Sequence, residues 1–161
     1  MKNLPIDLEV LADEMDYESL YGDFRRFLDT ETGEIMHLDE DLALQFEHDE
    51  EVEYDDQMAW EREELQQLRA MQDDPDRYEE IPVIEPEEAV GEMLEFAETI
   101  KDAKLKASAK RALKSADSNG KFTQFLAKHP KEKLRWRAFH EAWLLEKARS
   151  WLTSLEIVAR K

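Results

Sequence analysis

The sequence contains no cysteine and only four glycines among its 161 residues. The absence of cysteine excludes a disulfide-stapled scaffold, a thiolate zinc site and a cysteine nucleophile. The chain also lacks the glycine-rich phosphate loop, the dinucleotide-binding fingerprint and the Gly-x-Ser-x-Gly nucleophile elbow. These absences weigh against several large classes of enzyme.

Long apolar runs are also missing. No stretch approaches the length of a membrane span, and the first residues, Met1 to Asp7, lack the apolar core of a signal peptide. Apolar residues make up 42% of the chain and charged residues 39%, so a core can still be buried. A length near 160 suits one domain or two small lobes. We therefore expect a soluble, cytoplasmic protein without a membrane partner.

Charge is abundant but very unevenly distributed. The chain has 40 acidic and 22 basic residues, a formal net charge of −18. Residues 1–100 hold 34 acids and 6 bases, whereas residues 101–161 hold 6 acids and 16 bases. A sign reversal of this size indicates two lobes. We expect an acidic α+β lobe over residues 1–84 and a basic helical bundle over 85–161, joined in one compact unit.

Turn and cap residues predict the elements of the acidic lobe. Asn3 can cap a short first helix in which Pro5 occupies the first turn. Residues 28–35 read as a β-hairpin, because two β-compatible runs flank a Thr-Gly turn. Asp29 can bond back onto the turn amides there, and Gly33 can supply a positive φ. A helix over residues 58–71 and an extended segment over 78–84 follow.

The basic lobe reads as helix throughout. One helix starts at Pro86, and a second is capped by Asp102 and stops at Asn119-Gly120. A short third helix ends at Pro130, and a long last helix follows. Its expected apolar face is Leu134, Ala138, Ala142, Leu145, Ala148, Leu152 and Leu155. The expected aromatic core is Phe96, Phe122, Phe125, Phe139, Trp143 and Trp151. The predicted fold is mostly α with α+β character, the hairpin and first helix packing on the helical bundle.

Several short sequence blocks occur in a characteristic order. They are Leu28-Asp29-Thr30-Glu31-Thr32-Gly33-Glu34-Ile35, Arg77-Tyr78 with Ile81-Pro82, Met93 with Phe96, Gly120-Lys121-Phe122-Thr123-Gln124-Phe125, Trp136 with Phe139, and Trp151-Leu152 before Ile157. In these blocks the chain resembles the bacterial uncharacterised protein family 0158, over about four-fifths of its length. The resemblance implies one compact fold with the hairpin on the helices. It implies no reaction, because the family has no settled activity.

This chain departs from the family pattern at one place. The family usually carries an arginine pair between the two phenylalanines of the glycine-containing block, whereas this chain has Thr123-Gln124. The departure weakens the idea that this element grips an anion.

Residues suited to metal or acid–base chemistry are present but poorly spaced. The Asp29–Gly33 turn resembles a calcium loop, yet its glycine falls at the fifth position and not the sixth. The four histidines, His37, His48, His129 and His140, form no His-Glu-x-x-His motif. We therefore predict no catalytic residue, no metal site and no cofactor.

Two charged stretches are candidate binding surfaces. The first lies within residues 121–137, and its bases are Lys121, Lys128, Lys131, Lys133, Arg135 and Arg137. Bases interleaved with Phe122, Phe125 and Trp136 are typical of a nucleic-acid surface. The alternative, which we favour, makes the aromatic residues core and the bases a solvated face. The surface potential would distinguish the two interpretations, because binding needs the bases clustered on one open face, whereas the alternative has them paired with Asp or Glu.

The second stretch is acidic and could face a basic partner. Its residues are Asp39, Glu40, Asp41, Glu47, Asp49, Glu50, Glu51, Glu53, Asp55 and Asp56. Such a run can act as a nucleic-acid mimic or inhibitor, but charge runs are more often solvated surface.

The favoured hypothesis is a non-enzymatic cytoplasmic interaction protein with a protein partner, of which an acidic inhibitor or nucleic-acid mimic would be one form. The alternative is a nucleic-acid-binding module that uses the basic helices, and the third is a metal-dependent hydrolase. A homodimer is compatible with all three.

Overall fold

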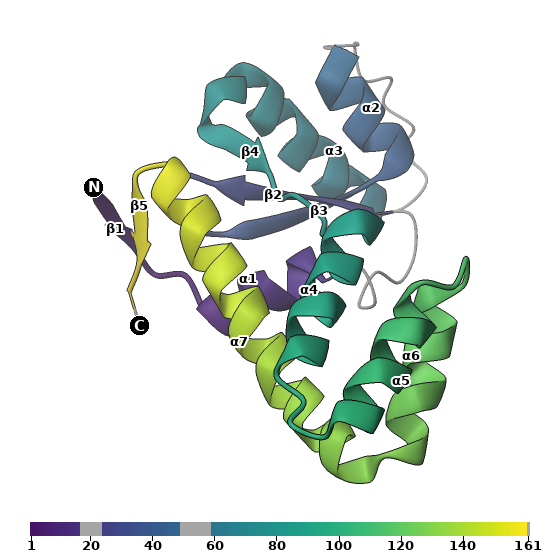
Figure 1. Ribbon diagram of the computed structural model, residues 1–161. Helices are drawn as coiled ribbons and strands as arrows, with labels where there is room; N and C mark the ends of the chain where they lie inside the picture. Colours follow the sequence, from purple (N-terminus) through teal and green to yellow (C-terminus); the bar gives the residue numbers. More distant parts are fainter. Residues whose placement is uncertain (17–23, 49–58, 161) are drawn as a thin grey trace. The chain divides into compact units, whose positions relative to one another are not determined.

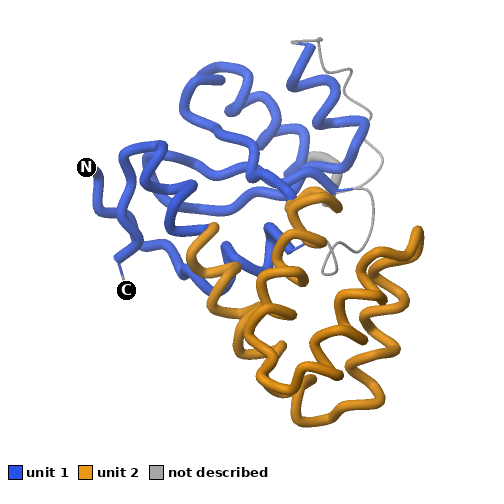
Figure 2. The backbone as a smooth tube through the Cα atoms, in the orientation of Figure 1, with its two compact units in different colours: residues 1–83, 148–161 blue, residues 84–147 orange. Residues whose placement is uncertain are grey.

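The computed structural model describes residues 1–16, 24–48 and 59–160 (Figure 1). These residues form seven α-helices and five short strands, which confirms a mostly α protein with α+β character. The chain divides into two compact units (Figure 2). Unit 1 comprises residues 1–83 and 148–161, and unit 2 comprises residues 84–147.

The two ends of the chain meet in unit 1. Strand β1 (Lys2–Leu4) pairs in parallel with β5 (Ile157–Ala159), with Lys2 opposite Ile157 and Leu4 opposite Ala159. The expected lobes of residues 1–84 and 85–161 therefore differ from the compact units, because residues 148–161 return to unit 1. A pairing between two three-residue strands at opposite ends of a chain leaves no local sequence signal.

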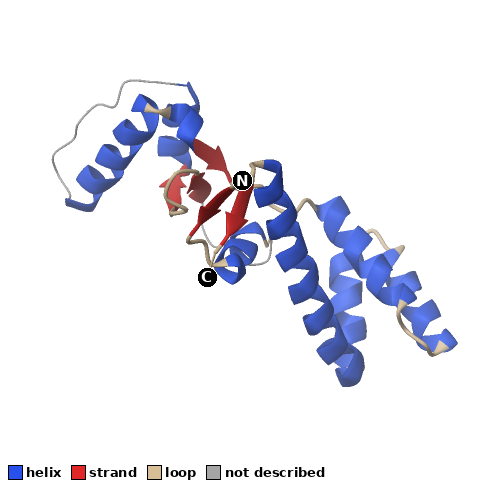
Figure 3. Cartoon of the chain, turned by 90° about the vertical axis from the view of Figure 1, so that its left-hand side faces the viewer, coloured by secondary structure: helices blue, strands red, loops and turns tan. Residues whose placement is uncertain are grey.

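The predicted hairpin is confirmed in unit 1. Strands β2 (Phe24–Asp29) and β3 (Ile35–Asp39) are antiparallel, and β4 (Tyr78–Glu80) pairs with the other edge of β2. These strands are labelled in Figure 1, and all described strands are red in Figure 3. Gly33 has a φ of 82°, and the Asp29 carboxylate accepts from the Glu31 and Thr32 amides at 2.9 and 3.3 Å. The sheet order is β3-β2-β4, so part of the expected extended segment is its third strand.

Helices complete unit 1. They are α1 (Leu8–Met15), α2 (Glu40–His48), α3 (Ala59–Asp73) and, across the unit boundary, the end of α7 (Pro130–Ser154), with a 3₁₀ turn at Pro75–Arg77. A buried cluster joins α2 and α3 to the hairpin, and it contains Phe27, Leu38, Leu42, Ala43, Leu65, Leu68 and Met71. Burial of each large apolar side chain contributes about 1.5–3 kcal/mol.

The prediction for the first helix was wrong at its start. Residues 2–4 form β1, so Asn3 is not a helix cap. The cap is Asp7, whose carboxylate accepts from the amides of Glu9 and Val10 at 3.0 and 3.3 Å. Three strand residues at a chain end lack a detectable period, whereas Asp7 was readable as a cap in its own right.

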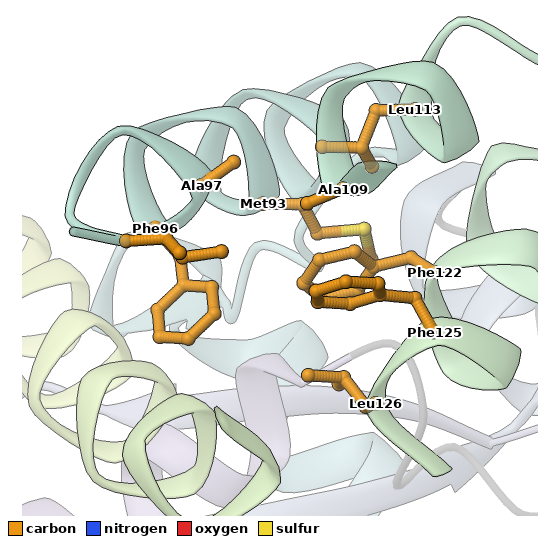
Figure 4. Close-up of a cluster of buried hydrophobic side chains, with 9 residues drawn as sticks. Met93, Phe96, Ala97, Ala109, Leu113, Phe122, Phe125 and Leu126 are labelled. Atoms are coloured by element: carbon orange, nitrogen blue, oxygen red, sulfur yellow. The ribbon is translucent and has the colours of Figure 1, made fainter. Parts of the chain in front are cut away.

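Unit 2 is helical. It contains α4 (Pro86–Glu98), α5 (Ala103–Leu113), α6 (Ser118–Lys128) and α7 up to Lys147. Its buried cluster is Met93, Phe96, Ala97, Ile100, Ala109, Leu113, Phe122, Phe125 and Leu126 (Figure 4). The expectation for Phe96, Phe122 and Phe125 is thus confirmed. Phe139 is only half-buried against this cluster, and the half-buried Trp143 and Trp151 are not among its buried members.

The expected end of the second helix was also wrong. Helix α5 ends at Leu113, and Gly120 lies inside α6. Asp117 caps α6 by accepting from the Gly120 amide at 3.2 Å. A Cβ at position 120 would clash with Asp117 Oδ2, so the glycine makes room for the capping carboxylate.

The apolar face expected for the last helix is only partly buried. Leu134 is 66% exposed, and Ala138 and Ala142 are exposed too, whereas Ala148 and Leu152 are buried. A helix of 25 residues that runs through both units does not keep one apolar face along its whole length.

Candidate functional site

The six predicted bases of residues 121–137 all lie on the surface of unit 2. Lys121 and Lys128 are on α6, and the other four are on the first turns of α7. Within the described residues only Arg135 forms an ion pair. The other five form none within the described residues, so pairing does not neutralise them, and both a binding surface and a solvated face fit this arrangement. Those five are Lys121, Lys128, Lys131, Lys133 and Arg137.

Arg135 has a structural role in unit 2. Its guanidinium pairs with Glu132 and donates to Thr99 Oγ1 at 2.9 Å. It also lies 5.4 Å from the centroid of the Phe96 ring. These contacts attach the start of α7 to the end of α4, so Arg135 contributes to the packing of unit 2.

Helix α5 and its flanks add cations that the sequence analysis did not single out. Lys101, Lys104, Arg111 and Lys114 are exposed and form no ion pair within the described residues. Lys106 and Lys110 differ from them because both pair with Glu98. The Lys110 ammonium lowers the pKa of the Glu98 carboxyl below its usual range. The signal was available, because Lys104 and Arg111 are seven residues apart and share one side of a helix.

The carboxylates of residues 101–137 all cap a helix or form an ion pair. The segment holds twelve bases and three acids. Asp102 caps α5 through the amides of Lys104 and Leu105, Asp117 caps α6, and Glu132 pairs with Arg135. None of the three therefore neutralises an exposed lysine. We refer to the exposed bases without an ion pair as the free cations of the segment: Lys101, Lys104, Arg111, Lys114, Lys121, Lys128, Lys131, Lys133 and Arg137.

The aromatic residues interleaved with these bases point into the core. Phe122 and Phe125 are 1% and 5% exposed, and their rings stack with centroids 6.1 Å apart. Trp136 packs edge-on against Phe96 at 5.4 Å and Phe122 at 5.1 Å. The interpretation as core residues is confirmed for Phe122 and Phe125, whereas Trp136 is half-buried and packs against their cluster. No Phe, Tyr or Trp of residues 101–137 is exposed, whereas a stacking platform needs open aromatic rings.

Comparison with known proteins places the chain in a family. The model of the Uncharacterised protein family (UPF0158) matches residues 1–160. The chain belongs to this family. No curated protein and no solved structure matches it significantly. Membership agrees with the resemblance drawn from the sequence blocks and assigns no reaction.

The predicted acidic surface of this UPF0158 protein lies mostly outside the described residues, since Asp49, Glu50, Glu51, Glu53, Asp55 and Asp56 do. Of the others, Asp39 caps α2 by accepting from the Leu42 amide at 2.8 Å, and Glu40 and Asp41 lie in the first turn of that helix. Glu47 pairs with Arg25 at 3.0 Å. Two of the four described acids therefore have internal partners.

One histidine contact was missed. His140 Nδ1 lies 2.8 Å from Glu92 Oε2, and the Glu92 side chain is only 1% exposed. The imidazole stacks on Trp136 and Trp143, with centroids 5.3 and 6.5 Å away. The sequence could not reveal this contact, because a partner 48 residues earlier carries no local signal. This contact ties α4 to α7 inside unit 2.

No metal centre is formed among the described residues, because no three of their His, Cys, Asp or Glu side chains are placed to share an ion. His37 lies on the surface and its Nε2 lies 2.8 Å from Glu14 Oε1.

A hollow of about 540 Å³ in unit 1 is lined by Lys2, Thr30 and the acids Asp76, Glu79 and Glu156, among others. None of the described helices is both long and apolar enough to cross a membrane.

Proposed function

We propose that this UPF0158 protein is a non-enzymatic binding protein whose unit 2 holds a polyanionic partner through the free cations of residues 101–137. The observation that supports the proposal is the charge inventory of the segment. Nine of its twelve bases have no ion pair within the described residues, while its three acids are all engaged. A local excess of uncompensated positive charge attracts anions.

The helices hold the backbone of several free cations in place before a partner binds. Lys104 and Arg111 are anchored on α5, and Lys121 and Lys128 on α6, so only their side chains need to be ordered on binding. A single exposed ion pair contributes about 0–1 kcal/mol. Several such pairs to one multivalent anion add up to measurable affinity, which salt must weaken because the Debye length is about 8 Å at 0.15 M ionic strength.

The opposite arrangement, in which the acidic tract holds a basic partner, has less support. Asp39 and Glu47 are engaged within unit 1. No contact among the described residues favours that arrangement.

Binding to heparin, used as a polyanion probe, tests the proposal. Lys121→Gln with Lys128→Gln should weaken the affinity of the full chain about tenfold, because two free cations are lost. The matched control is Lys106→Gln with Lys110→Gln, which removes the same charge from cations already paired with Glu98. We expect it to change the affinity less than twofold. Equal losses in both variants, or no binding by the parent protein in 50 mM salt, would contradict the proposal.

A further inference from the structure

The free cations are spread over three successive helical segments and are not gathered around one point. On α5, Lys104 and Arg111 are seven residues apart, as are Lys121 and Lys128 on α6. Seven residues correspond to about two turns and about 10.5 Å of helix axis. Lys131, Lys133 and Arg137 continue the series on α7. A partner that engages all of them needs closely and regularly repeated negative charge.

The same surface lacks anchors for an acidic protein. Specific protein interfaces depend on a few aromatic or apolar residues that insert into the partner. In residues 101–137, all of which the structure describes, Phe122 and Phe125 are buried in the core and Trp136 packs half-buried against it. Leu134 is the one exposed large apolar side chain of the segment. A segment with nine free cations and a single exposed large apolar side chain matches a polymer of phosphates better than a folded acidic protein.

The burial of the aromatic residues also bears on whether the nucleic acid is single-stranded or double-stranded. Proteins that hold single strands stack the bases on exposed aromatic rings. Contacts to a duplex can instead be made entirely to phosphates, whose axial charge spacing is about 1.7 Å. We propose that unit 2 binds double-stranded nucleic acid by its phosphate backbone, without base stacking and without sequence preference. This inference rests on the proposed polyanion binding.

The acidic remainder of the chain does not forbid such binding. Its repulsion acts over the Debye length, about 8 Å at physiological ionic strength, whereas the free cations would touch phosphates directly. The three acids within residues 101–137 are held by caps and by Arg135. Binding should therefore depend on these cations and not on the negative net charge of the chain.

Fluorescence anisotropy with the full chain tests the inference. The labelled probes are a 20-base-pair DNA duplex, the matching RNA duplex, one of the DNA strands alone, and heparin, at 50–200 mM salt. We expect at least one duplex to bind about tenfold more tightly than the single strand. Lys121→Gln with Lys128→Gln should reduce the slope of log K against log salt by about 2, since each lost phosphate contact removes about 0.9. Lys106→Gln with Lys110→Gln should leave that slope unchanged.

The outcomes separate the inference from the proposed function. Binding to heparin without binding to either duplex, or tighter binding to the single strand, overturns the duplex inference and leaves polyanion binding standing. A duplex slope that falls equally in both double variants also overturns it. Failure to bind any probe in 50 mM salt contradicts both the duplex inference and the proposed polyanion binding.

Discussion

The two units use their positive charges in opposite ways. In unit 1 cations are scarce, and Arg25, Arg26 and Arg77 are each paired with a carboxylate. Arg25 contacts both Glu47 and Glu80, and Arg77 contacts both Asp29 and Glu31. In unit 2, nine of thirteen bases have no ion pair within the described residues. These three arginines therefore stabilise the fold of unit 1, whereas ion pairs hold only four of the thirteen bases of unit 2 within the described residues.

Burial explains why this difference matters. The Asp29 side chain is 5% exposed, and its bidentate contact with Arg77, at 2.8 and 2.6 Å, compensates for its desolvation. A lysine such as Lys121 sits in water and needs no such partner. Loss of a cation is thus expected to affect stability in unit 1 and binding in unit 2.

The largest expected effect concerns the aromatic residues of unit 2. Phe122→Ala should lower the free energy of unfolding by about 3–5 kcal/mol, because it empties the centre of the buried cluster. Urea unfolding followed by circular dichroism measures this change. Leu134→Ala, at an exposed position, is the control and should change stability by less than about 0.5 kcal/mol. A small effect at Phe122 would mean that the aromatic rings belong to the binding surface.

The next effect concerns Asp29. Asp29→Asn keeps the shape of the side chain but removes the charge that faces Arg77, and we expect a loss of about 2 kcal/mol at pH 7. The Arg77 guanidinium holds the pKa of the Asp29 carboxyl well below its usual range, which is near 3.9 in an unfolded chain.

The pH dependence follows from that shift. The unfolded state takes up the proton first as the pH falls, so the contribution of Asp29 is complete above about pH 5 and declines below about pH 4. The difference in stability between the parent protein and Asp29→Asn should therefore shrink on acidification. A difference that stays constant from pH 7 to pH 3 would show that the charge does not act as described.

The hairpin turn gives a smaller effect. Gly33→Ala should destabilise the protein by about 1–2 kcal/mol, because its φ is 82° and a Cβ would lie 2.9 Å from Ile6 Cγ1. Gly91→Ala is a matched control, since that glycine lies within α4 and a Cβ there meets nothing within 4 Å. We expect Gly91→Ala to stabilise the protein by about 0.5–1 kcal/mol. Thermal melts of both variants measure the difference, and a shift in the same direction would contradict it.

The smallest expected effect on stability comes from substitution of the free cations. Lys121→Gln with Lys128→Gln should change the free energy of unfolding by no more than about 0.5 kcal/mol. A loss above about 1 kcal/mol in urea unfolding would show that these lysines support the fold, and the contrast between the two units would fail.

Local signals in the sequence predicted much of the fold. The hairpin followed from Asp29 and Gly33, and the start of α5 followed from Asp102, because turns and caps are specified by adjacent residues. The pairing of β1 with β5 could not be predicted, since three-residue strands 155 positions apart share no pattern. The predicted helix end near Gly120 was wrong because glycine occurs both at the ends of helices and in first turns where a capping side chain leaves no room for a Cβ.

The candidate site shows the same division. The bases of residues 121–137 and the core role of Phe122 and Phe125 were readable from charge and helical spacing. The ion pairs could not be predicted from the sequence, because Glu98 comes close to Lys106 and Lys110 only when α4 and α5 pack together. The contact of His140 with Glu92 likewise depends on the packing of α4 against α7.

Residue-resolved acetylation of lysine amines in the full chain, with and without heparin, measures most directly whether the free cations form the binding surface. Mass spectrometry then reports how far the polyanion slows the reaction at each site. We predict strong protection of Lys121, Lys128, Lys131 and Lys133, and little change at Lys2, whose ammonium donates to the Thr30 carbonyl in unit 1. Protection of Lys2 to the same degree, or no protection of the four lysines under conditions where heparin binds, would contradict the assignment.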